Sequence, residues 1–168
     1  LDSSPSSSGS IEYSALDYTA ALDAVGAYEE EVDFVAVCKE RSSIVDHLLT
    51  TVNEMESNAK LALGLAGVEA PVDATSFSHS YDDSRLQLFA PARHSDYTSM
   101  IGAYAGMRAN IGLTTTAINQ SLVLRDRPHR SLDSSERGNL IDENVTPAET
   151  VGKSARVADD ITTVTTDN

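Results

Sequence analysis

Histidine and carboxylate side chains are the groups in this sequence whose chemistry suits metal binding or acid–base catalysis. The chain has four histidines, one in each of four separate segments: His47, His79, His94 and His129. No two of them have the i, i+4 spacing that places both imidazoles on one helix face. His79 with Asp82 and Asp83 offers mixed nitrogen and oxygen ligands, but a polar run of this kind is more often a solvated loop. We therefore expect no metal site.

The densest run of acids is Glu29-Glu30-Glu31, followed by Asp33. Paired carboxylates can act as general acid and base, but only when both face one substrate. Consecutive residues of a helix point in different directions, so these side chains would not converge. A solvated acidic face is the better interpretation.

The known nucleophile and phosphate-binding motifs are missing from the sequence. It contains no G-x-S-x-G, no G-x-x-x-x-G-K-[ST] and no dinucleotide-binding fingerprint. Its single cysteine, Cys38, lies in an apolar stretch, which favours a buried inert thiol over a nucleophile. We expect no enzymatic activity, no cofactor and no small-molecule substrate.

A local basic cluster stands out in this acidic chain, formed by Arg125, Arg127 and Arg130. These arginines either form a docking site for phosphate, nucleic acid or an acidic partner surface, or close a helix, because cations are stabilised at a helix C-terminus. If they dock, an acidic neighbouring subunit suits them better than DNA, because the rest of the chain repels a polyanion.

A helix is predicted after Ser95-Asp96, with an apolar stripe at steps of three and four residues. Its candidate helix-packing residues are Tyr97, Ile101, Gly102, Tyr104, Gly106 and Ile111, and the stripe continues to Ile118 and Leu122. Each glycine weakens an isolated helix by about 1 kcal/mol relative to alanine. The glycines and alanines also make a slim surface, which suits close approach by another helix.

The N-terminal elements are also predicted to be helical. Apolar residues from Tyr18 to Val35 and again from Val37 to Ala59 follow helical spacing, as one helix or as two with a break near Lys39 to Ser43. Gly64, Gly67 and Pro71 are expected to end this region.

The remaining elements are a long connection and a short C-terminal helix. Residues 68–95 are expected to be a connection with one extended piece over Arg85 to Ala90. Thr146-Pro147-Ala148-Glu149 matches a helix start, with an N-cap, a proline at N1 and a glutamate at N3. A helix is predicted to continue from there to Ile161.

The expected fold is therefore all-α, a helical hairpin or small bundle with a long central connection and extended polar termini. Its parts are a flexible Ser-rich arm (1–10), a helical domain (11–131) and a polar linker with a short helix (132–168).

Composition bears on the habitat and on the partners. The chain has 168 residues, with 26 acids against 12 bases and a formal charge of −14. Arginine outnumbers lysine and aspartate outnumbers glutamate, a balance typical of proteins from salt-loving archaea and their viruses. Such a charge opposes binding to nucleic acid. No apolar run approaches the roughly 18 residues needed to cross a bilayer.

Two functional hypotheses follow. The first is a non-enzymatic structural or assembly subunit of a multi-subunit particle, in a virion or cytoplasm, for example a virion or head-to-tail connector component of a halophilic archaeal system. Its partners would be copies of itself or other subunits, because residues 71–131, with six bases and five acids, can lie against acidic segments of a neighbour. The alternative is a helical regulatory or sensory dimerisation module in the cytoplasm.

Overall fold

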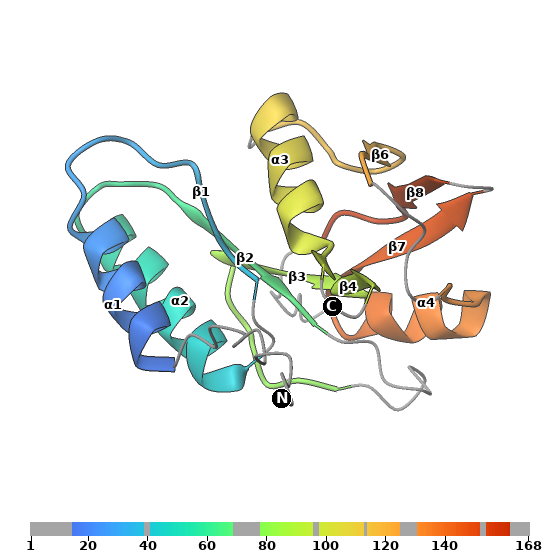
Figure 1. Cartoon of the computed structure of the whole chain (residues 1–168), viewed down its shortest axis with the longest axis horizontal. Coiled ribbons are helices and arrows are strands. Elements are labelled where there is room, and N and C mark those ends of the chain that lie inside the picture. Colours follow the sequence, from blue (N-terminus) through green and yellow to red (C-terminus); the bar gives the residue numbers. More distant parts are fainter. Residues whose placement is uncertain are drawn as a thin grey trace, which may run out of the picture.

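The protein forms a three-layer α/β fold around a six-stranded mixed sheet (Figure 1). The structure is a computed structural model. It describes residues 15–38, 41–68, 78–95, 98–112, 114–124, 131–151 and 154–161. The helices are α1 (Ala15–Gly26), α2 (Ser42–Ser57), α3 (Ile101–Ile111) and α4 (Ser134–Asp142).

The main sheet has the strand order β1-β2-β3-β7-β8-β6. Its strands are β1 (Phe34–Val37), β2 (Leu63–Gly67), β3 (Leu86–Ala90), β6 (Ser121–Leu122), β7 (Val145–Val151) and β8 (Ser154–Val157). The first four strands in this order are parallel, whereas β8 is antiparallel to both β7 and β6. A separate two-stranded sheet pairs β4 (Arg93–Ser95) with β5 (Thr98–Ser99).

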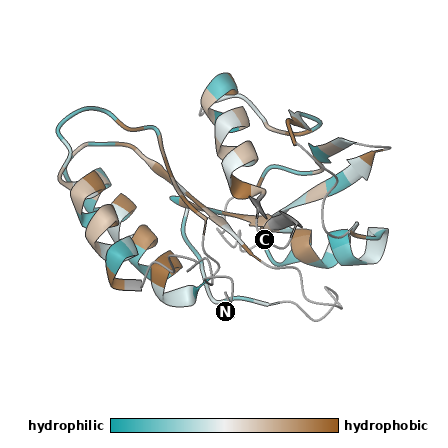
Figure 2. Ribbon diagram, in the orientation of Figure 1, coloured by the Kyte–Doolittle hydropathy of each residue, from teal (hydrophilic) through white to brown (hydrophobic). Residues whose placement is uncertain are grey.

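Apolar side chains from the sheet pack against helices on both faces. Val35, Leu86 and Leu88 share one core with residues of α1, α2 and α4. Leu65 and Phe89 share the other core with α3, where the Phe89 and Tyr104 rings stack with centroids 4.4 Å apart. Strands β2 and β3 are buried along their whole length, as expected for the centre of a parallel sheet. Figure 2 shows these strands as largely hydrophobic, and the loop between α1 and β1 as largely hydrophilic.

The all-α prediction and the helical bundle are therefore wrong. The stripe from Tyr18 to Val35 is helical only as far as Gly26, and its last residue lies in β1. The second stripe begins with Val37, the last residue of β1, and is helical only in α2, which has no side-chain cap from either Ser42 or Ser43. The expected helix stop at Gly64 and Gly67 is strand β2.

Gly67 is required where two segments approach closely. A Cβ built on Gly67 would lie 2.7 Å from the Cβ of Ala92. Because glycine has no side chain, β2 and the chain after β3 can pack together at this position.

The predictions for the middle of the chain are partly correct. The extended piece over Arg85 to Ala90 is confirmed as β3. The following helix is shorter than predicted, because α3 ends at Ile111 and the last stripe residue, Leu122, lies in β6. Ser95 does not cap α3, whose N-cap is Met100.

The predicted C-terminal helix is a β-hairpin. Thr146-Pro147-Ala148-Glu149 lies in β7, and the residues that follow form β8. Pro147 fits this strand because its carbonyl accepts from the Ala158 N–H at the end of β8. The Pro147 nitrogen, which carries no hydrogen, points toward β8 like the carbonyl, so no hydrogen bond to β3 is lost. The Thr146 hydroxyl bonds to the backbone of Ile161 instead of capping a helix.

Helix α4 was not predicted, although its start carries a complete capping box. The Asp133 carboxylate accepts from the N–H groups of Ser135 and Glu136, and the Glu136 side chain accepts from the Asp133 N–H. This reciprocal arrangement satisfies the free donors of the first turn.

Candidate functional site

The predicted helix-packing residues lie on two sides of α3. Ile101 and Tyr104 are fully buried against the sheet, and Ile111 is half-buried beside them. Gly102 and Gly106 are exposed, and a Cβ added to either would meet no heavy atom within 4 Å. The slim face of α3 is therefore open within the described part of the chain, and the buried face packs on strands.

The other predicted docking residues cannot be placed. Tyr97, Arg125, Arg127 and Arg130 lie outside the described residues. The residues on either side of these arginines are described: Leu124 follows β6, and the Ser131 hydroxyl bonds to the Thr150 hydroxyl of β7 at 3.1 Å.

The histidines with described side chains serve structural contacts. His47 Nε2 lies 2.7 Å from an Asp23 carboxylate oxygen and ties α2 to α1. His79 Nδ1 accepts from the Tyr81 N–H, while its Nε2 contacts the Glu143 carbonyl. Both nitrogens of His79 are therefore engaged. Among the described residues, no group of three or more His, Cys, Asp or Glu side chains is arranged to hold a metal ion. Cys38 is exposed, contrary to the expected buried thiol.

A buried polar cluster fixes the C-terminal end of the described chain beneath α3. The Asp160 carboxylate accepts from Gln87 Nε2 (2.7 Å), the Ala117 N–H (2.7 Å) and Arg108 Nη1 (3.2 Å). Burial, with the nearby Asp160 charge, raises the pKa of Tyr104, so this phenol stays neutral. Gln87, Tyr104 and Arg108 are buried, so a substrate has no access to them. We interpret the cluster as structural.

The surface best suited to binding lies along β1, the edge strand of the sheet next to α1. Leu63 donates to the Asp33 carbonyl, so in this parallel pair Asp33, Val35 and Val37 turn their backbone groups toward β2. The N–H and C=O groups of Phe34 and Ala36 therefore point to the open side. In the part of the chain that the structure describes, no strand pairs with β1 on this side. Backbone groups left unpaired in this way are a template for another strand.

An apolar hollow of about 460 Å³ adjoins this edge on the side of α1. Its lining comes from the end of α1, the following loop and β1: Ala24, Val25, Tyr28, Val32, Phe34, Val35 and Ala36. Tyr28 is 52% exposed at its rim. Apolar side chains of an added strand could be buried here.

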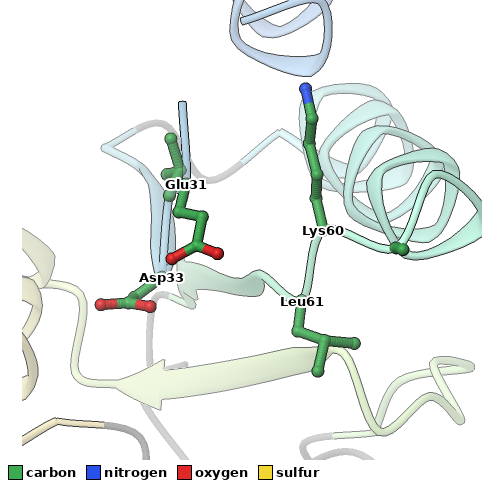
Figure 3. Close-up of a pocket in the computed structure, with 6 residues that line it drawn as sticks. Glu31, Asp33, Lys60 and Leu61 are labelled. Carbon is green, nitrogen blue, oxygen red and sulfur yellow. The ribbon is translucent and has the colours of Figure 1, made fainter. Parts of the chain in front are cut away.

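An acidic hollow of about 290 Å³ lies at the start of β1 and shares Val32 with the apolar one. Glu31 and Asp33 project from the chain that enters β1, and Lys60 and Leu61 lie across the hollow on the chain that enters β2 (Figure 3). The Lys60 ammonium points away from the two carboxylates and donates to the Tyr28 carbonyl. Leu61 is 58% exposed. We call the open strand edge and the two hollows the β1 edge surface.

No protein-family model matches the chain, and no curated protein is significantly similar to it. Among the described residues, no helix is long and apolar enough to cross a membrane.

Sequence reasoning missed the β1 edge surface, although it noted the acidic run. The four residues of β1 are all apolar, which is the pattern of a short buried strand as well as of a helix. The acids just before it mark the loop that enters the strand.

Proposed function

We propose that this protein is a non-enzymatic structural or assembly subunit, which joins other subunits of a larger particle by strand addition at β1. The observation that carries this proposal is the open edge of β1 beside an apolar hollow. Main-chain hydrogen bonds would supply affinity, and the hollow would select apolar side chains of the added strand.

The electrostatics of the surface fit this role in concentrated salt. Glu29, Glu30, Glu31 and Asp33 are all exposed beside the edge. At low ionic strength these charges repel a second acidic subunit, whereas molar salt shortens the Debye length to about 3 Å. The composition supports the more specific proposal of a virion or head-to-tail connector component from a salt-loving archaeal system.

The test is mass by light scattering after size exclusion, from about 0.1 to 3 M KCl, which shortens the Debye length from about 10 Å to below 3 Å. We expect a defined oligomer at high salt. A monomer at every salt concentration would contradict the proposal.

Two substitutions at one position test the role of the strand edge. Ala36→Pro removes an N–H that points to the open side and should abolish assembly, because proline cannot donate to an added strand. Ala36→Val keeps that N–H and is the matched control, which should assemble. Both variants should retain the wild-type circular dichroism. Equal assembly of the two variants would exclude the β1 edge as the contact.

A further inference from the structure

The two ends of β1 carry opposite charges. Glu31 and Asp33 are exposed just before the strand, and Arg41 is exposed shortly after it. Within the part of the chain that the structure describes, none of these three side chains forms an ion pair or a side-chain hydrogen bond. Lys60 is directed to the Tyr28 carbonyl and does not neutralise the two acids. Each end of β1 therefore offers a charge for a partner to match.

The end that carries Arg41 attracts carboxylates for a second reason. Arg41 is the N-cap of α2, a helix that begins without a side-chain cap and without an acid in its first turn. The free N–H groups and the dipole at a helix N-terminus favour a negative charge, whereas the residue present here is a cation. A carboxylate brought to this end of β1 would be stabilised by both the helix and the guanidinium group.

A second copy of β1 matches both ends at once if it runs antiparallel to the first. Its Glu31 and Asp33 then lie at the end that carries Arg41, and the same contact is repeated at the other end. A parallel second copy would place acids beside acids. The strand between the ends is apolar in both copies, so no charge is buried along the pair.

The backbone of β1 allows this pairing about a two-fold axis at Ala36. In an antiparallel pair, residues that lie directly opposite exchange both of their hydrogen bonds, so groups on the open side of one strand must meet groups on the open side of the other. Phe34 and Ala36 turn their backbone groups to that side, and the alternation of an extended chain adds Cys38. With Ala36 opposite its own copy, Phe34 lies opposite Cys38.

The apolar hollow is covered by the same contact. Val35 packs in the core shared with α1, so α1 and the hollow lie on one face of the sheet. Directly opposite residues turn their side chains to the same face, so the pair joins the α1 face of one copy to that of the other. The two hollows then face each other across the pair, with the half-exposed Tyr28 at the rim of each. Apolar contacts therefore extend what would otherwise be a short strand pair.

We propose that the strand added at β1 is the β1 of a second copy of this chain, antiparallel about a two-fold axis at Ala36. The two six-stranded sheets then form one continuous sheet. This inference rests on the proposed assembly function and identifies the partner. Because the contact joins the same surface of both chains, it closes as a dimer.

The first test places a cysteine on the two-fold axis. Ala36→Cys combined with Cys38→Ser brings the two Cα atoms at position 36 to about 5.5 Å from each other. A disulfide spans Cα distances of about 4.4–6.8 Å. Oxidation by air with a copper catalyst in molar KCl should therefore convert this variant to a covalent dimer on a non-reducing gel. Reduced variant should assemble like the wild type, because Ala36 is exposed.

The matched control is the wild type, whose single cysteine is Cys38. Cys38 lies opposite Phe34 in the proposed pair, so the two Cys38 Cα atoms are about 13 Å apart along the strands. That distance is too long for a disulfide. The wild type should therefore remain without a covalent dimer under the same oxidation.

The second test exchanges charges at the lowest KCl concentration at which the wild type assembles, where screening is weakest. Glu31→Arg and Arg41→Glu should each weaken association about tenfold, because like charges then meet at both ends of the pair. An equimolar mixture of the two variants should recover wild-type association, since each end of a mixed pair again joins opposite charges. Asp142→Arg is the control for Glu31→Arg, because it changes the net charge equally on α4, which packs on β7.

The outcomes separate the two proposals. Wild type that stays monomeric at every salt concentration contradicts the assembly function itself. Wild type that assembles while the Ala36→Cys variant forms no covalent dimer overturns the two-fold pairing and leaves the assembly function standing. A covalent dimer of the wild type, or a mixture of the charge variants that associates no better than either alone, also overturns the pairing.

Discussion

Removal of the Asp160 carboxylate should destabilise the fold strongly. Asp160→Ala deprives Gln87, Arg108 and the Ala117 N–H of their shared acceptor. The Arg108 and Asp160 side chains are only 6% and 13% exposed, and breaking a buried pair of this kind costs about 3–5 kcal/mol. Three lost hydrogen bonds at about 1–1.5 kcal/mol each lead to a similar total.

The assay is thermal unfolding followed by far-UV circular dichroism in molar KCl. The expected loss lowers Tm by about 6–20 °C, because 1 kcal/mol corresponds to about 2–4 °C in a domain of this size. Asp142→Ala, which removes an exposed acid of α4, is the control and should change stability by at most about 0.5 kcal/mol. Asp160→Asn keeps one acceptor oxygen and should fall between the two.

A loss below about 1 kcal/mol for Asp160→Ala would refute this reasoning, because no uncompensated buried cation would then remain. The same result would mean that water reaches Arg108 in the folded protein.

Two further predictions concern a close contact and a charge cluster. Gly67→Ala should destabilise the protein by about 1–3 kcal/mol, because the added Cβ clashes with Ala92. Gly106→Ala should stabilise the isolated subunit by about 1 kcal/mol, because its added Cβ meets no neighbouring atom and alanine favours a helix. Chemical denaturation measures both free energies of unfolding, and equal effects of the two substitutions would contradict the packing described. Although burial opposes it, pairing with Arg156 and Arg137 lowers the pKa of Glu149 below its ordinary 4.5. The contribution of Glu149 to the free energy of unfolding is therefore complete above pH 4.5 and is lost as the pH falls through the folded-state pKa. The Glu149→Gln variant should be less stable than the wild type at pH 7 and should lose less stability on acidification. Parallel profiles of stability against pH for the two proteins would refute this.

The helices α1, α2 and α3 lie within stretches that the sequence predicts as helical, and β3 lies within the predicted extended piece. The reasons for the failures are physical. Leu63-Gly64-Leu65-Ala66-Gly67 is rich in small and aliphatic residues, which are compatible with a helix, but the burial of every residue on both faces favours a central strand. This burial depends on partners distant in sequence. The local spacing of apolar residues therefore does not indicate which partners bury the strand.

Capping patterns show the same limit. Asp133-x-x-Glu136 and Thr146-x-x-Glu149 match the same local rule, yet only the first starts a helix. The second lies opposite β3, where Gln87 and the backbone of Ile161 bond to Thr146. Long-range pairing therefore overrides the helix signal. The acidic loop was noted from sequence, but its place beside an open strand edge required the topology.

The position of β3 between β2 and β7 has a consequence for the growing polypeptide. Until residues 145–151 have been synthesised, a chain that already contains β1, β2 and β3 has no strand to cover the outer side of β3. That strand is apolar except for Gln87, whose amide donates to Thr146, Asp160 and Ile161. An uncovered apolar edge is a template for aggregation. A product that terminates before residue 145 should therefore be recovered as insoluble material, whereas one extending to residue 161 has closed this edge.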